Sequence, residues 1–224
     1  MSAYFITGTG TDIGKTWLSC ALLKYWCEAG LSTRAYKPVL SGYAESDAEL
    51  SDAGQLLTAQ GLDVNANAID EIAPWRFAAP LSPDMAAAQE GREIAFAELL
   101  EFTQRRVTST NWQAEQILVE GVGGVMVPLD ATHTVRDWIA TSALPCIVVA
   151  GNYLGSLSHT LSALAALREV NVKVKAVVVN ESLASSVVLA DCLASLQRHA
   201  DKVPCVAIHR DNPASGIARL AAML

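Results

Sequence analysis

The chain has 224 residues, of which 51% are hydrophobic and 17% charged, and its formal net charge is −7. This length and composition predict one α/β domain over residues 1–224 with a substantial core. The acidic balance argues against a nucleic-acid partner, because phosphate backbones are held by clusters of Lys and Arg. The sequence shows neither a leader pattern nor an apolar run of about 18 residues, so we expect a cytoplasmic protein without a membrane partner.

The cysteines are five in number and scattered along the chain: Cys20, Cys27, Cys146, Cys192 and Cys205. An odd count without ligand-like spacing is typical of free thiols rather than of disulfides or a metal site. Most of them stand in apolar runs, so we expect them to be buried.

A glycine-containing loop, TGTGTDIGKT at residues 7–16, follows an apolar strand at 4–6 and precedes a helix predicted to end at Ala29. A strand, a loop, Gly-Lys-Thr and a helix make the arrangement of a phosphate-binding P-loop. Lys15 would reach the outer phosphates and the Thr16 hydroxyl would ligate Mg²⁺. The spacing departs from the usual one, because Thr9 stands where a glycine is expected. The alternative is an ordinary turn with a surface lysine.

A second strand is predicted over residues 33–39, running into 40–42. Lys37 and Ser41 therefore fall at a carboxyl strand end, the edge where open α/β sheets bind ligands. Lys37 could also be a plain surface lysine. Residues 43–52 are acidic and mostly solvated loop or helix-start positions. A P-loop with bound Mg²⁺ needs further oxygen ligands, and among these carboxylates we select Asp52.

A third informative stretch is residues 117–124, ILVEGVGG, in which a buried strand ends at Glu120. In P-loop enzymes an acidic residue at the end of a neighbouring strand holds Mg²⁺. The glycines that follow would let another backbone pass close to the phosphates. An acid at a strand end also occurs for structural reasons alone.

The remaining pattern alternates strands with helices. Residues 61–73 are weakly patterned, and the prolines in 74–83 predict an extended connection. Helices are predicted over 84–89, 96–107, 135–140, 158–169, 187–198 and 214–223, and strands over 125–128, 146–150, 174–180 and 203–208. This alternation predicts a doubly wound, mainly parallel sheet of the P-loop NTPase type with right-handed crossovers. Asn180 could read a base edge or cap a turn, and the helix start near Ser158 could bind an anion or be conventionally capped.

Several motifs in order along the chain together resemble dethiobiotin synthetases. They are residues 7–16, 36–39 with Ser41-Gly42, 51–53, Pro80 with 82–83, 90–91, 119–124 and 154–155. The lengthened P-loop has the spacing of that family, and the Lys-Pro strand end with its downstream serine is equally specific. The resemblance covers most of the chain.

The resemblance implies a homodimeric, ATP- and Mg²⁺-dependent ligase of biotin biosynthesis. Its substrates would be 7,8-diaminopelargonate, CO₂ and ATP, and its products dethiobiotin, ADP and phosphate. One rival is a partitioning-type P-loop switch ATPase, whose P-loop carries an extra lysine where this chain has Gly10 and Thr11. A cobyrinate-type amidotransferase would need a further glutaminase domain, for which 224 residues leave no room.

The resemblance also implies site residues, position by position. Lys37 and Lys15 would be catalytic, and Thr16, Asp52 and Glu120 would hold the metal. Nucleotide contacts would come from Asp12, Ile13, Gly14, Lys15, Thr16, Trp17, Asp52, Glu120, Gly121, Val122, Gly123, Asn180, His209, Arg210 and Asp211. Substrate contacts would come from Thr11 and Ser41, and from Gly155, Ser156 and Ser158 of the other subunit. His209-Arg210-Asp211 replaces the apolar, proline-containing loop of many members, so use of CTP or another nucleotide stays open.

Overall fold

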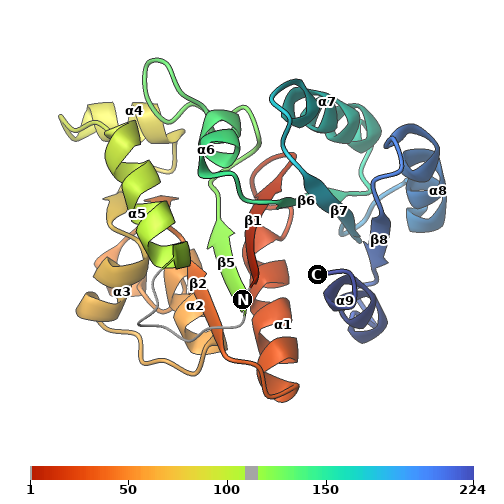
Figure 1. Cartoon of the computed structure of the whole chain (residues 1–224), viewed down its shortest axis with the longest axis horizontal. Helices are drawn as coiled ribbons and strands as arrows, with labels where there is room; N and C mark the ends of the chain where they lie inside the picture. Colours follow the sequence, from red (N-terminus) through yellow and green to blue (C-terminus); the bar gives the residue numbers. More distant parts are fainter. Residues whose placement is uncertain (1, 109–115) are drawn as a thin grey trace.

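The computed structural model describes residues 2–108 and 116–224 (Figure 1). Its centre is a six-stranded sheet in the order β2-β5-β1-β6-β7-β8. The strands are β1 (Ser2–Gly8), β2 (Thr33–Tyr36), β5 (Gln116–Glu120), β6 (Cys146–Gly151), β7 (Val174–Asn180) and β8 (Cys205–Ile208). Every neighbouring pair in this sheet is parallel. The predicted α/β class with a doubly wound, mainly parallel sheet is confirmed.

Helices form two layers around the sheet (Figure 1). One layer contains α1 (Lys15–Glu28), α2 (Asp52–Ala59) and α9 (Ala214–Ala221); the other contains α5 (Phe96–Thr108), α6 (Val135–Ser142), α7 (Ser156–Glu169) and α8 (Leu189–His199). Cover on both faces explains why β6 is a continuous run of buried residues. Phe5 on β1 packs edge-on against Trp138 on α6, with ring centroids 4.7 Å apart.

A second, two-stranded parallel sheet pairs β3 (Val39–Ser41) with β4 (Trp75–Phe77). The single strand predicted over 33–39 is therefore wrong. Its break falls at Lys37-Pro38, where proline has no N–H for a ladder and the Lys37 N–H donates to the carbonyl of Ile72 instead. The break turns the chain out of the main sheet directly after β2. Around this small sheet lie η1 (Glu45–Asp47), α3 (Ala66–Ile72) and α4 (Pro83–Gln89).

The strand predicted over residues 125–128 does not form, and a helix occupies a stretch for which no element was predicted. Residues 125–128 form a turn rather than a strand, with one isolated bridge between Pro128 and Thr134. The N–H of Val125 donates to the carbonyl of Gly8, which holds the turn against the end of β1, and Val125 is buried there. The weakly patterned stretch 61–73 contains α3, whose start is capped by the Asn65 side chain on the Ala68 N–H.

The carboxyl ends of the six strands meet at one edge of the main sheet. The chain leaves β1 toward β2 on one side, whereas it leaves β5 toward β6 on the other, and such a reversal of strand order opens a crevice. Most predicted site residues lie at or just after the ends of β1, β2, β5, β7 and β8. The others are Ser41 on β3, Asp52 at the start of α2, and Gly155, Ser156 and Ser158 after β6. All five cysteines are free thiols, as predicted; Cys146, Cys192 and Cys205 are buried but Cys27 is exposed. Within 2–108 and 116–224, no helix has the length and apolar character to cross a membrane.

Candidate active site

The P-loop connects the end of β1 to the start of α1. Asp12 and Gly14 both adopt left-handed backbone conformations, with φ of 57° and 88°. A side chain at Gly14 would also collide with Asn180, because its Cβ would lie 2.6 Å from Asn180 Nδ2. Lys15, the first residue of α1, is only 7% exposed, and its Nζ donates to the carbonyl of Gly10 at 2.6 Å. The loop is thus tightly folded around the Lys15 ammonium.

Glu120 stands at the centre of a buried polar cluster. Its position follows from the sheet register, since it ends β5 and pairs with Ile6 of the adjacent β1. Glu120 Oε1 accepts hydrogen bonds from Thr16 Oγ1 at 2.7 Å and from Lys37 Nζ at 2.9 Å. Its Oε2 accepts from Ser19 Oγ at 2.7 Å. The carboxylate joins residues from α1, β5 and the β2 end.

Lys37 lies between two carboxylates. Besides Glu120, its Nζ is 3.1 Å from Asp52 Oδ2 at the start of α2, and it donates to the carbonyl of Gly121 at 2.7 Å. Burial works to lower the pKa of Lys37, but the charges of Glu120 and Asp52 outweigh it and raise that pKa. Burial likewise works to raise the pKa of Asp52, and Lys37 and the Thr16 hydroxyl bring that pKa down. Lys37 and Asp52 are therefore both charged at neutral pH.

Lys15 and Lys37 line the same cleft, of about 660 Å³. Burial lowers the pKa of Lys15 to about 8, and the positive charge of Lys37 contributes to the same shift. Two cations that disturb one another across a cleft attract an anion into the space between them. The cleft is also lined by Thr11, Asp12, Gly14, Thr16, Trp17, Leu40, Ser41, Asp52, Pro80, Leu81, Ser82, Pro83, Val122, Gly123 and Val127.

The far wall of this cleft is apolar, with single polar groups. Leu40, Leu81 and Val127 contribute aliphatic surface, and Ser41 contributes a hydroxyl. Ser41 Oγ is buried and has no hydrogen-bond partner among the described residues. An aliphatic molecule with polar substituents matches this lining. Leu81 and Val127 were not predicted as site residues, because an isolated apolar residue in a loop has no distinctive sequence signal.

A second cleft, of about 640 Å³, lies on the other side of the P-loop. It shares Thr11, Asp12, Gly14 and Trp17 with the first cleft, and it adds Ile13, Asn180, Glu181 and Arg210 among others. Asn180 Nδ2 donates to the carbonyl of Ile13 at 2.8 Å. Asn180 Oδ1 is buried and has no partner within the described residues. A buried, unpaired acceptor calls for a donor from a ligand.

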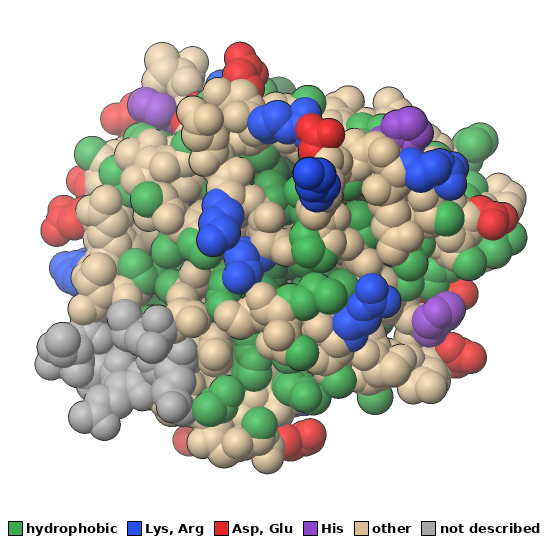
Figure 2. Space-filling view, turned by 45° about the vertical axis from the view of Figure 1, so that its right-hand side comes forward, with side chains coloured by type: hydrophobic (Ala, Val, Ile, Leu, Met, Phe, Trp, Pro, Cys, Tyr) green, Lys and Arg blue, Asp and Glu red, His purple; other side chains and the backbone are tan. Residues whose placement is uncertain are grey.

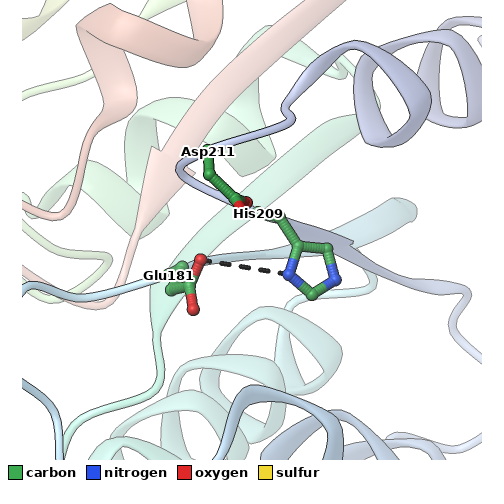
Figure 3. A group of neighbouring side chains, drawn as sticks. All are labelled: Glu181, His209 and Asp211. Carbon is green, nitrogen blue, oxygen red and sulfur yellow. Dashed lines mark ion pairs between the residues drawn. The ribbon is translucent and has the colours of Figure 1, made fainter.

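The loop after β8 carries His209 and Asp211 beside Glu181 (Figure 3), and Arg210 lies between them in the chain. Glu181 Oε2 accepts from the Arg210 N–H at 2.9 Å and lies 3.9 Å from His209 Nδ1. Of the three predicted loop residues, Arg210 lines the second cleft, whereas His209 and Asp211 do not. On the face drawn in Figure 2, Lys and Arg side chains stand in small separate groups.

The start of α7 does not reach the cleft between Lys15 and Lys37 within one chain. None of Gly155, Ser156 and Ser158 lines it. The prediction for Ser156 is the least compatible with the structure: its side chain is 1% exposed, its Oγ faces Cys192 Sγ and its N–H donates to Tyr153. Ser158 is exposed. A groove of about 420 Å³, lined by Thr11 and His159 among others, connects the P-loop with the α7 face.

Relatives with known names are similar in sequence along nearly the whole chain. A family model described as an AAA domain matches residues 2–208. The ATP-dependent dethiobiotin synthetase BioD of Acidiphilium cryptum is 46% identical, covering 95% of this chain and 95% of the relative. The protein of the same name from Methylobacterium nodulans is 40% identical, covering 97% and 98%.

Solved structures show the same fold at low sequence identity. The MinC:MinD cell division protein complex of Aquifex aeolicus matches with a TM-score of 0.59 at 12% identity, covering 99% of this chain and 94% of that one. The hydrogenase maturation factor HypB of Archaeoglobus fulgidus matches with a TM-score of 0.57 at 10% identity, covering 99% and 87%. These matches show the fold alone. The full-length relatives show the family: the chain belongs to the ATP-dependent dethiobiotin synthetases.

Proposed function

We propose that this protein is an ATP- and Mg²⁺-dependent ligase that closes a urea ring on 7,8-diaminopelargonate with CO₂, giving dethiobiotin, ADP and phosphate. The observation that carries the proposal is the shared cleft of Lys15 and Lys37. The relatives named ATP-dependent dethiobiotin synthetase support the same reaction. Two anions must meet in this chemistry, a carbamate and a γ-phosphate, and two lysines facing one cleft offset their repulsion.

The reaction needs three bond-forming steps. One amine nitrogen attacks the carbon of CO₂ and loses a proton, which gives a carbamate. A carbamate oxygen then attacks the γ-phosphorus and ADP leaves. The second amine attacks the carbonyl carbon of this mixed anhydride and phosphate leaves, which closes the five-membered urea ring. Lys15 would bind the β- and γ-phosphates, and Lys37 would stabilise the carbamate and the transferring phosphoryl group.

The residues present fit a bound Mg²⁺. Thr16, Asp52 and Glu120 converge as one hydroxyl and two carboxylates, the oxygen ligands that Mg²⁺ prefers. Lys37 Nζ lies within 3.1 Å of both carboxylates, so this point of the structure already accommodates a cation. When bound there, the metal would neutralise phosphate charge and orient the γ-phosphoryl group.

The two clefts would divide the substrates between them. The diamine would lie in the cleft with Thr11 and Ser41, where apolar side chains match its aliphatic chain. The nucleobase would lie in the second cleft with Asn180 and Trp17. The carboxylate of the diamine would reach Gly155 and Ser158 of the partner subunit in a homodimer, a part of the proposal that comes from the family resemblance. A cytoplasmic location is proposed on the same basis.

The decisive experiment incubates the protein with Mg²⁺-ATP, bicarbonate and the diamine. We expect diamine-dependent release of ADP together with a cyclic urea that mass spectrometry identifies. Lys37→Gln should lower turnover by about 100-fold or more while nucleotide binding persists, because it removes a charge that acts on the reacting groups. ATP hydrolysis at the same rate without the diamine would contradict the ligase and point to a switch ATPase.

A further inference from the structure

Ser19 on α1 is a buried hydroxyl that the proposed reaction does not yet use. It is 0% exposed, one helical turn after Lys15. Its Oγ lies 2.7 Å from Glu120 Oε2 and 3.0 Å from the carbonyl of Lys15. A serine hydroxyl has one proton to donate, and the charged carboxylate is both nearer and the stronger acceptor. Ser19 therefore donates to Glu120.

The two oxygens of Glu120 face different neighbours. Oε1 faces Thr16 and Lys37, at the point where the metal, the nucleotide and the carbamate are expected to meet. Oε2 faces away from the cleft toward Ser19, which supplies its hydrogen bond among the described residues. Glu120 is 1% exposed, so water does not readily replace that bond. A carboxylate without it would rotate to find another donor.

We propose that Ser19 is a positioning residue that fixes the orientation of the Glu120 carboxylate, so that Oε1 stays aimed at the metal and Lys37. This inference rests on the proposed role of Glu120 as a metal ligand. Groups that hold a ligating carboxylate in place commonly change metal affinity or activity by 10- to 100-fold when they are removed. A purely structural role is the alternative, since a buried helix serine can also donate to the carbonyl four residues earlier.

The test measures Mn²⁺ binding to the protein with a non-hydrolysable ATP analogue, which requires no turnover. Ser19→Ala removes the hydroxyl without changing the backbone, and we expect about tenfold weaker Mn²⁺ binding and a comparable fall in kcat. Ser19→Cys fills nearly the same space with a weak donor, and it should give intermediate values. Thr103→Val is the control for lost stability, because Thr103 is another buried helix hydroxyl, on α5, that bonds the Leu99 carbonyl and the Trp138 indole and lines neither cleft.

The outcomes separate the possible explanations. The inference is overturned if Ser19→Ala binds Mn²⁺ within about twofold of the parent affinity while its stability falls as in Thr103→Val. Ser19 would then be a structural residue. If Ser19→Ala does not fold, unchanged Mn²⁺ affinity in Ser19→Cys overturns it equally. Weaker Mn²⁺ binding in both variants supports it, even if the parent protein forms no cyclic urea; in that case the proposed function fails and the positioning role stands.

Discussion

Lys15 and Lys37 are the same residue type in one cleft, yet their pKa values move in opposite directions. Lys37 has two carboxylates in contact, which more than offset its burial. Lys15 contacts a neutral carbonyl and lies near Lys37, so burial prevails and lowers its pKa to about 8. Lys37 therefore keeps its charge over the physiological range, whereas Lys15 loses its charge just above that range unless a phosphate arrives.

The lowered pKa of Lys15 predicts pH-dependent nucleotide binding. Phosphate binding favours the ammonium form, so above pH 8 binding must take up a proton and the affinity falls as pH rises. At pH 9 only about a tenth of empty Lys15 is protonated, which predicts a Kd about tenfold above that at pH 7. Calorimetry in buffers of different ionisation enthalpy measures both quantities. Lys15→Met should bind weakly without this pH dependence; equal affinities at pH 7 and 9 in the parent protein would contradict the assignment.

The orientation of the Asn180 side-chain amide predicts which nucleotides the protein accepts. Its Nδ2 donates to the carbonyl of Ile13, so in the proposed site the acceptor Oδ1 would face the base. Adenine and cytosine offer an amino group at the matching edge, whereas guanine and uracil offer a carbonyl there. We expect ATP and CTP to support turnover better than GTP and UTP, and a comparison of kcat/KM for the four nucleotides measures this. Asn180→Asp keeps an acceptor for the base but cannot donate to the Ile13 carbonyl. This variant therefore separates recognition of the base from support of the P-loop.

Position in the sequence was sufficient to predict some contacts and insufficient for others. Lys37 and Glu120 could be predicted to meet because each lies at the carboxyl end of a strand of a parallel sheet, and such ends share an edge. Ser19 could not be predicted, because its partner Glu120 is 101 residues away and a lone serine in an apolar helix resembles any buried helix serine. Glu181 was missed for the same reason: it follows β7, and its neighbour Arg210 follows β8.

At the scale of elements, α6 begins with a complete capping box. Asp137 Oδ2 accepts from the N–H and the hydroxyl of Thr134 at 2.8 and 2.7 Å. Burial works to raise the pKa of Asp137, but these hydrogen bonds outweigh it and lower that pKa. The cap therefore stabilises the fold when Asp137 is ionised. This contribution is complete above the ordinary pKa of 3.8 and disappears as pH falls through the lower folded-state value.

Removing this cap predicts a measurable loss of stability. Asp137→Ala should lower the free energy of unfolding by about 1 kcal/mol at pH 7, measured by urea denaturation. The difference from the parent protein should shrink below pH 4. Glu101→Ala, an exposed change on α5, serves as the control and should stay within about 0.5 kcal/mol. A difference that grows as the pH falls would contradict the sign of the Asp137 contribution.

The elements predicted correctly are those whose burial comes from the sheet itself. A run such as β6 is apolar because two helix layers cover it, and the pattern records this directly. Residues 125–128 have a similar apolar pattern for another reason, since they pack as a turn on the end of β1. Periodicity cannot separate the two cases over four residues. The break at Pro38 was visible in the sequence, but its consequence depends on Ile72, a distant partner.

At the scale of the whole molecule, the proposed homodimer makes a prediction about Leu154. This residue precedes α7 and its side chain is 85% exposed. If the helix start of one subunit completes the site of the other, Leu154→Asp should give a monomer in sedimentation and lower turnover, while nucleotide binding persists. Leu50→Asp, 76% exposed before α2, is the matched control and should remain dimeric. A parent protein that sediments as a monomer at full activity would remove the shared site from the proposal.

The contact between Gly14 and Asn180 couples the two clefts mechanically. Any atom added at Gly14 would strike the Asn180 amide, and that amide is fastened to the carbonyl before Gly14. The proposed phosphate site and the proposed base site consequently share one rigid unit. A nucleotide whose base pushes this amide aside would also disturb the turn proposed to hold its γ-phosphoryl group. We therefore expect a poorly accepted nucleotide to show a lower rate of phosphoryl transfer as well as a lower affinity.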